Sequence, residues 1–376
     1  MTNVFDYLLW RGDLTLEQSP FEDVDGLILS CLSYHYFTEV LKQYESAPVR
    51  IEELAKKVKA LPAEKLRVRD PQDVALLQLV GKSRRFQNME VCLYVDHVDA
   101  EKEAQFSAVT ILLGDGTFFV AYRGTDMTLV GWKEDFNMSF LDFVPAQIMA
   151  AIYLLYAAQN LSGAIRMGGH SKGGNLAVFA AAVCPRKTQD RILCVYNYDG
   201  PGFQEGMLRF QGYNDIIPKV HSFVPQSAVI GMLLSHQGGY TVVRSAEKGL
   251  LQHDPYSWEI LGADFVRLED VSKESKFWDK TLKSWLNSLS QQKREKFVDA
   301  LFELLSTNYT DELGVLDLSP KNVYRSLQTL KDEDEETKKA ILEGLWLLWQ
   351  AARKTAGDYG LGLQKLGDLK LLDKKR

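Results

Sequence analysis

The segment AIRMGGHSKGGNLAVFA, residues 164–180, decides which fold we expect for this chain. Its apolar start is typical of a strand, and the small and apolar residues that follow Gly173 are typical of a helix. The pattern Gly-x-Ser-x-Gly, formed by Gly169, Ser171 and Gly173, lies where that strand would turn into the helix. The glycines permit a sharp turn that exposes the Ser171 hydroxyl at the helix N-terminus, where the helix dipole favours negative charge. The segment therefore predicts a turn that presents a nucleophilic serine.

Strand and helix patterns alternate on both sides of this turn. Upstream, residues 114–116 read Gly-Asp-Gly, which is a hairpin signal between two apolar stretches. The expected strands are residues 91–98, 104–113, 117–123, 164–167, 192–198, 220–224 and 240–244, and the expected central helices are 144–160 and 173–183. Parallel strands interleaved with helices predict a doubly wound, mostly parallel α/β sheet with its chemistry beyond the carboxyl ends of the strands.

Helical patterns flank the central block at both ends. We expect residues 1–88 to form a helical segment that packs on the core without carrying chemistry, and residues 89–262 to form the core. Residues 263–376 are expected to form a helical extension. The apolar run from Trp346 to Trp349 predicts a buried helix, with contact of this extension with a partner or a membrane surface as the alternative.

Composition narrows the classes of function. The 376 residues include 44 lysines and arginines against 50 aspartates and glutamates, a net charge of −6, so we expect no nucleic-acid partner. The 4 cysteines lack the spacing of a disulfide scaffold or a zinc site. The N-terminus lacks a signal-peptide pattern and no apolar stretch could span a bilayer, which predicts a cytoplasmic protein without stable membrane insertion. Transient contact with a membrane surface and the oligomeric state stay open.

Two further motifs precede the serine: the stretch Tyr122-Arg-Gly-Thr-Asp126, and a Trp-x-x-Asp formed by Trp132 and Asp135. Together with Gly-His-Ser-x-Gly-Gly, over roughly residues 90–260, they resemble the class 3 (fungal-type) lipases and their uncharacterised bacterial relatives in the α/β-hydrolase superfamily. The resemblance implies an α/β-hydrolase-like sheet. It also implies an oxyanion hole formed by the backbone amides of Thr125 and Lys172, and a lid at residues 127–140.

A serine hydroxyl needs an adjacent base, which in these hydrolases follows the nucleophile in the chain. Three histidines follow it: His221, within an expected strand, and His236 and His253, both on loops. We favour His253 because it follows the last expected strand on a loop closed by a proline, where the resembled families place their base. His236 remains the alternative.

The acid is harder to assign. Gln226 or Ser227 stands where the resembled lipases carry their aspartate. We favour Asp199, because it ends the strand after the elbow helix and Gly-Pro-Gly follows it. The alternatives are Asp215, Asp254, a substitute formed by Ser227 or the backbone, and no acid at all.

These residues predict a serine hydrolase that cleaves a small-molecule acyl ester or lipid. Ser171 would attack the carbonyl, His253 would move the proton and Asp199 would orient the imidazole. This chemistry requires no metal or organic cofactor. The alternative is a catalytically reduced protein of the same fold that binds a lipid-like ligand or a protein partner.

Overall fold

The computed structural model describes residues 2–126, 129–138, 141–306 and 335–358. The chain forms two compact units. Unit 1 comprises Met1–Asp126 and Asp142–Val271, and unit 2 comprises Met127–Leu141 and Ser272–Arg376.

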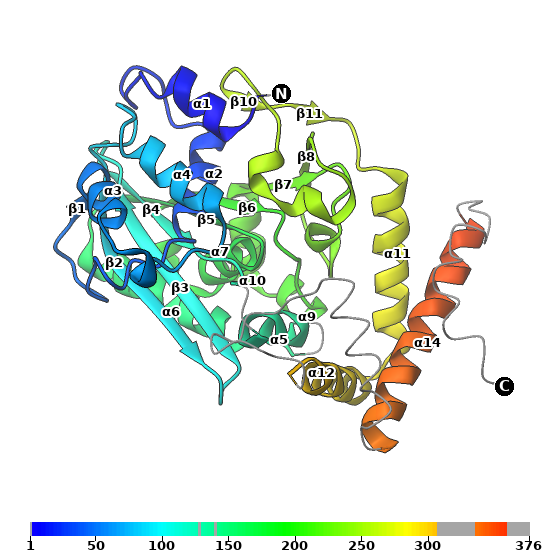
Figure 1. Cartoon of the computed structure of the whole chain (residues 1–376). Coiled ribbons are helices and arrows are strands. Elements are labelled where there is room, and N and C mark those ends of the chain that lie inside the picture. The colour runs from blue at the N-terminus through cyan, green and yellow to red at the C-terminus, as the bar shows by residue number, and fades with distance from the viewer. Residues whose placement is uncertain (1, 127–128, 139–140, 307–334, 359–376) are drawn as a thin grey trace. The chain divides into compact units, whose positions relative to one another are not determined.

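Unit 1 is built on a sheet that has nine strands among the described residues, in the order β1-β2-β3-β4-β5-β6-β7-β8-β11 (Figure 1). From β4 to β8 neighbouring strands run parallel, while the pairs from β1 to β4 and the pair β8–β11 are antiparallel. The strands are β1 (Val49–Arg50), β2 (Glu90–Asp99), β3 (Ala104–Leu112), β4 (Thr117–Tyr122), β5 (Ala164–His170), β6 (Ile192–Tyr198), β7 (Val220–Pro225), β8 (Thr241–Val243) and β11 (Arg267–Leu268). The short strands β9 (Ile260–Leu261) and β10 (Asp264–Phe265) pair separately.

One face of the sheet is covered by the helices that connect the parallel strands. These are α6 (Pro145–Asn160), α7 (Lys172–Val183), α8 (Arg186–Gln189), α9 (Glu205–Leu208) and α10 (Gln211–Ile216). Every residue of α7 from Lys172 to Ala182 is buried, since this helix packs against β4, β5, β6, α6 and α10 at once. Small side chains suit it to that position, because they let the helix approach the strands closely.

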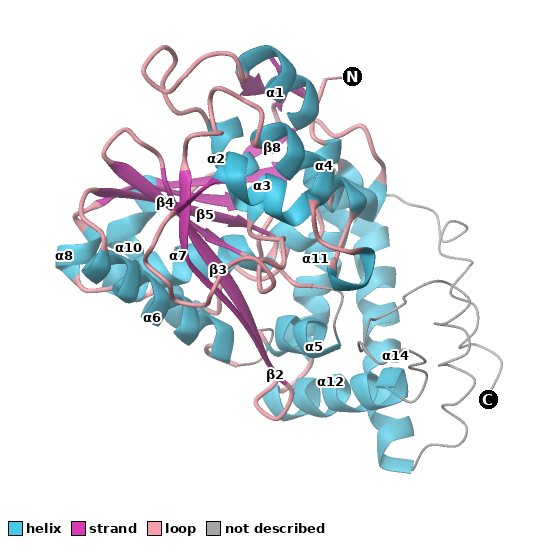
Figure 2. Cartoon of the chain, turned by 60° about the vertical axis from the view of Figure 1, so that its left-hand side comes forward, coloured by secondary structure: helices cyan, strands magenta, loops and turns pink. Residues whose placement is uncertain are grey.

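The opposite face is covered by helices from the N-terminal part of the chain, as Figure 2 shows. They are α1 (Val4–Arg11), α2 (Asp23–Leu32), α3 (Ile51–Lys59) and α4 (Pro71–Val80). Helix α2 lies so close to β6 that a Cβ at Gly26 would come within 2.4 Å of the Tyr198 hydroxyl. A buried ion pair, with Arg85 Nε 2.7 Å from Asp25 Oδ1, joins α2 to the segment after α4 within this layer.

The protein has an α/β fold, and its strand order follows the order of the chain without reversal. In a doubly wound sheet the order reverses, which sends connecting helices to both faces. Here the connections between parallel strands cover one face only, and the N-terminal helices cover the other. The topology therefore differs from the doubly wound arrangement that the alternating pattern predicted.

Unit 2 contains the helices α5 (Leu129–Asn137), α11 (Lys273–Ser288), α12 (Gln291–Ser306) and α14 (Glu335–Asp358). Its core joins Trp285, which donates from Nε1 to the Gly344 carbonyl at 2.9 Å, to side chains of α12 and α14. The apolar run of α14 is only partly buried. Leu345, Leu347 and Leu348 pack on that core, whereas Trp346 is 51% exposed.

Two sequence-based expectations concern this unit. Residues 127, 128, 139 and 140 of the expected lid lie outside the described residues, and the rest of that stretch includes α5. Among the helices that the structure describes, we find none with the length and hydropathy needed to cross a membrane.

Candidate active site

Ser171 lies at the sharp turn between β5 and α7. Its backbone has φ 59° and ψ −134°, a left-handed conformation that costs a non-glycine residue free energy and that is often found at functional sites. The turn is held by two backbone hydrogen bonds, from Ser171 N to the Tyr198 carbonyl (2.9 Å) and from Gly174 N to the Ser171 carbonyl (2.9 Å). The Ser171 side chain makes no capping bond to α7. The predicted strand-turn-helix is thus present, with its hydroxyl unused by the helix.

The glycines around Ser171 are required by close backbone approach. A Cβ at Gly173 would lie 2.2 Å from the Tyr122 carbonyl oxygen, and one at Gly169 would lie 2.3 Å from the Gly173 carbonyl carbon. Contacts this short do not occur between real atoms, so any side chain at either position would force β4, β5 and α7 apart.

A histidine and a carboxylate meet beside this turn. His253 Nδ1 lies 2.6 Å from Asp199 Oδ2, and the other carboxylate oxygen accepts a hydrogen bond from Gly231 N at 3.1 Å. Asp199 is buried, and this burial raises its pKa while the hydrogen bond from His253 opposes the shift. His253 ends the short 3-10 helix η4 (Gly249–His253), and its side chain is 28% exposed.

The register of the sheet brings this pair and the serine to one place. His170 and Tyr198, the last residues of the adjacent parallel strands β5 and β6, are partners in register. Ser171 directly follows β5 and Asp199 directly follows β6, so both lie at the same carboxyl edge of the sheet. The ring of His253 lies 4.6 Å, centroid to centroid, from the ring of His170.

The two residues expected to form the oxyanion hole belong to two segments next to the serine. Thr125 follows Gly124, where an added Cβ would be 3.2 Å from Ser171 Cβ, so this loop passes directly beside the serine. Lys172 is the first residue of α7, where backbone amides point out of the helix end. Its buried ammonium group is held away on β3, donating to the Gln105 carbonyl (3.1 Å) and side-chain oxygen (2.8 Å).

The alternative residues have other partners in the structure. Asp215 Oδ2 binds Arg186 Nη1 at 3.0 Å, and Asp254 accepts from Tyr256 N at 3.0 Å as the cap of the next short helix. His221 lies 3.6 Å from Asp23, and the Ser227 amide donates to the Gln252 side chain. Of Asp199, Asp215 and Asp254, Asp199 is the aspartate whose carboxylate contacts the His253 ring.

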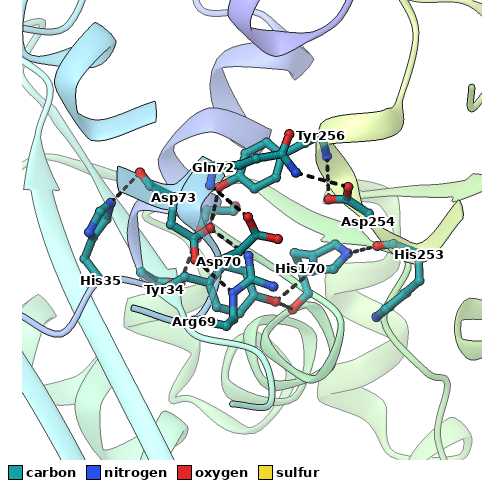
Figure 3. A network of polar contacts seen from close by, with 12 residues as sticks. Tyr34, His35, Arg69, Asp70, Gln72, Asp73, His170, His253, Asp254 and Tyr256 are labelled. Atoms are coloured by element: carbon teal, nitrogen blue, oxygen red, sulfur yellow. Dashed lines mark hydrogen bonds and ion pairs between the residues drawn. The ribbon is translucent and has the colours of Figure 1, made fainter. Parts of the chain in front are cut away.

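Sequence reasoning missed a polar network that contacts the loop of His253 (Figure 3). His170 Nε2 lies 2.7 Å from the His253 carbonyl oxygen, and His170 Nδ1 lies 2.7 Å from the hydroxyl of Tyr34. Tyr34 belongs to the N-terminal segment, which was expected to pack without carrying chemistry. The position of His170 directly before the serine was the available signal for it, whereas Tyr34 carries none.

The described residues contain no group of three or more His, Cys, Asp and Glu side chains arranged to hold a metal ion. The described site combines a strained serine, a histidine with its Nδ1 bound to a buried carboxylate, and a helix N-terminus. Such a set can activate a hydroxyl and stabilise an oxyanion.

Fold and site together define an α/β protein with a serine turn next to a His–Asp pair. The chain belongs to the Mbeg1-like family, whose model matches residues 80–303. That match includes the serine turn and both members of the pair. Among solved structures, the crystal structure of M37 lipase is similar at 13% sequence identity and a TM-score of 0.37, covering 57% of this chain and 70% of the lipase. No curated protein matches the chain.

Proposed function

We propose that this protein is a serine hydrolase of the α/β-hydrolase type that cleaves carboxylic esters with an apolar acyl group. The observation that carries the proposal is the 2.6 Å contact between Asp199 Oδ2 and His253 Nδ1 at the sheet edge where Ser171 adopts its strained turn. A carboxylate on Nδ1 leaves Nε2 of the same imidazole free to act as a base.

In the proposed reaction, Ser171 Oγ attacks the ester carbonyl while His253 Nε2 accepts its proton. The bond to Asp199 keeps the proton of the neutral ring on Nδ1 and stabilises the imidazolium that forms. The backbone amides of Thr125 and Lys172 donate to the oxyanion, and each such donor typically lowers the barrier by about 3 kcal/mol. His253 then protonates the departing alkoxide, and water hydrolyses the acyl-serine by the same steps.

The preference for an apolar acyl group rests on the surface beside the base. Leu250 and Leu251, within two or three residues of His253, are 67% and 66% exposed. Two exposed leucines next to a proposed base offer apolar area to an acyl chain or a lipid surface. Burial of that area on binding would be worth roughly 25 cal/mol per Å².

We also propose a cytoplasmic location. It is supported by four cysteines that are all buried and unpaired, Cys31, Cys92, Cys184 and Cys194, since free thiols persist in reducing compartments.

The test is labelling by a fluorophosphonate probe together with hydrolysis of p-nitrophenyl butyrate and octanoate. Wild-type protein and the control Ser235→Ala are expected to be labelled and to hydrolyse both esters, while Ser171→Ala should do neither. Labelling that survives in Ser171→Ala would overturn the nucleophile assignment. A wild type that binds a fatty acid tightly but is neither labelled nor active would favour the catalytically reduced alternative.

A further inference from the structure

We propose that His170 is a positioning residue, whose Nε2–H holds the backbone of His253 so that the imidazole stays aligned with Asp199 and Ser171. The inference rests on the proposed function for its effect on turnover. The contact itself can be tested without turnover.

The hydrogen bonds of His170 are compatible with one neutral tautomer only. The His253 carbonyl can only accept a hydrogen bond, so His170 Nε2 must carry the proton at the 2.7 Å contact. His170 Nδ1 then presents a lone pair, and the Tyr34 hydroxyl donates to it at 2.7 Å. His170 is 2% exposed, and burial lowers its pKa well below the usual range, which keeps the ring neutral.

Tyr34 packs against Arg69, which is itself held by the carboxylate of Asp73. The guanidinium of Arg69 lies 3.7 Å from the centroid of the Tyr34 ring. Arg69 binds Asp73 in two places, with Nε 3.0 Å from Oδ2 and Nη2 2.7 Å from Oδ1. Paired bonds of this kind fix orientation as well as distance. The tyrosine that binds His170 Nδ1 is thus held by residues of the N-terminal layer.

The network returns to the segment from which it started. Asp73 Oδ1 accepts a hydrogen bond from the Tyr256 hydroxyl at 2.6 Å, and Tyr256 lies three residues after His253. The closed path runs from the His253 carbonyl through His170, Tyr34, Arg69 and Asp73 to Tyr256 (Figure 3).

This anchoring matters because His253 lies on a short, irregular segment. It ends a five-residue 3-10 helix that starts at Gly249, a residue with φ +57°. The two leucines of this short helix are exposed. The bond to Asp199 fixes one ring nitrogen, and the bond from His170 fixes the backbone behind the ring. A misplacement of about 1 Å at a reacting group can cost roughly 100-fold in rate.

The first test uses the wild-type protein and needs no substitution. In protein labelled with ¹⁵N-histidine, the ring nitrogens of His170 should report a neutral imidazole protonated on Nε2 at neutral pH. A neutral ring protonated on Nδ1 would overturn the inference, because its Nε2 could not donate to the His253 carbonyl.

The second test compares His170→Phe, which keeps a ring but loses the donor, with His170→Gln, whose amide N–H can reach a similar position. His170→Phe should lower kcat for p-nitrophenyl butyrate by roughly 100-fold with KM within about twofold, and His170→Gln should recover about tenfold of that loss. The control is His97→Gln on the exposed end of β2, which should match wild type. Equal kcat in His170→Phe and wild type would overturn the inference, as would a folded His170→Gln that is no better than His170→Phe.

A readout independent of turnover is the far-downfield proton resonance of the bond between His253 and Asp199, assigned by its loss in Asp199→Asn. It should broaden in His170→Phe and persist in His170→Gln and His97→Gln. Should His170→Phe fail to fold, Tyr34→Phe removes one oxygen and is expected to broaden the same resonance, whereas an unchanged resonance in Tyr34→Phe would count against the inference. An inactive wild type with this resonance pattern would refute the hydrolase and leave the role of His170 standing.

Discussion

Asp199 Oδ2 lies 2.6 Å from His253 Nδ1 although 54 positions separate the two residues in the chain. Asp199 directly follows β6, which lies next to β5, the strand that Ser171 directly follows, whereas His253 comes after β8. An acid from this neighbouring strand suffices, because an imidazole is oriented by the position of a carboxylate and not by the strand that delivers it.

Replacing Asp199 by Asn should lower kcat for p-nitrophenyl butyrate by about 10³- to 10⁴-fold, because an amide favours the wrong tautomer of His253. KM should stay nearly constant, since the carboxylate is bound to the imidazole and is 1% exposed. The matched control is Asp215→Asn, which alters a carboxylate paired with Arg186. Steady-state kinetics would measure kcat for both variants, and a similar fall in kcat for Asp215→Asn would count against the assignment.

The close packing at the serine turn predicts a large penalty for Gly173→Ala. Its Cβ would lie 2.2 Å from the Tyr122 carbonyl, so we expect the free energy of unfolding to fall by about 3 kcal/mol. Gly206→Ala is the control, since nothing lies within 4 Å of its Cβ and alanine favours helix, giving no change or a gain of up to about 1 kcal/mol. Urea denaturation checks both, and equal midpoints would contradict the packing argument.

The N-terminal layer should depend strongly on its buried ion pair. Both side chains of the Asp25–Arg85 pair are fully buried, so Asp25→Ala would leave an uncompensated charge and cost about 3–5 kcal/mol. The exposed pair between Glu52 and Lys56 provides the comparison, because Glu52→Ala should change stability by less than about 0.5 kcal/mol. Thermal denaturation would measure the loss of stability in each variant, and similar losses in Asp25→Ala and Glu52→Ala would refute the prediction.

Acid should destabilise the protein through His35. Burial lowers its pKa from 6.5 to about 4, so below pH 6.5 the unfolded chain binds a proton that the folded chain does not. The free energy of unfolding should therefore be highest above pH 6.5 and fall by about 3 kcal/mol as the pH drops to about 4. Denaturation of wild type and His35→Gln at several pH values would reveal this contribution as a steeper fall in wild type. His97→Gln, which alters an exposed histidine, should keep the wild-type slope.

The local part of the fold could be predicted, because periodicity and glycine positions report local geometry. The strand β6 matches its predicted range, and β5, β7, α6 and α7 differ from theirs by one to three residues. The two-residue strands β9, β10 and β11 could not be predicted, since so short a stretch has no period. Neither could the strand order, which depends on which connections cover which face.

The candidate site divides in the same way. Asp199 was favoured for its place at the end of a strand and for the Gly-Pro-Gly after it, and His253 for its loop position and the resemblance to class 3 lipases. The link from Tyr34 to His170 spans 136 positions and depends on how α2 packs on the sheet, which no local pattern encodes. Contacts that depend on long-range packing therefore could not be predicted from the sequence.

The composition of unit 2 has a consequence for synthesis on the ribosome. Helix α5 ends at Asn137, but α12, against which it packs, begins at Gln291. At roughly 5–20 residues per second, α5 emerges about 8 to 30 seconds before this partner exists. Throughout that interval α5 lacks the helix against which it packs, and the aromatic contact of Phe136 with Phe302 can form only once translation has passed the later helix.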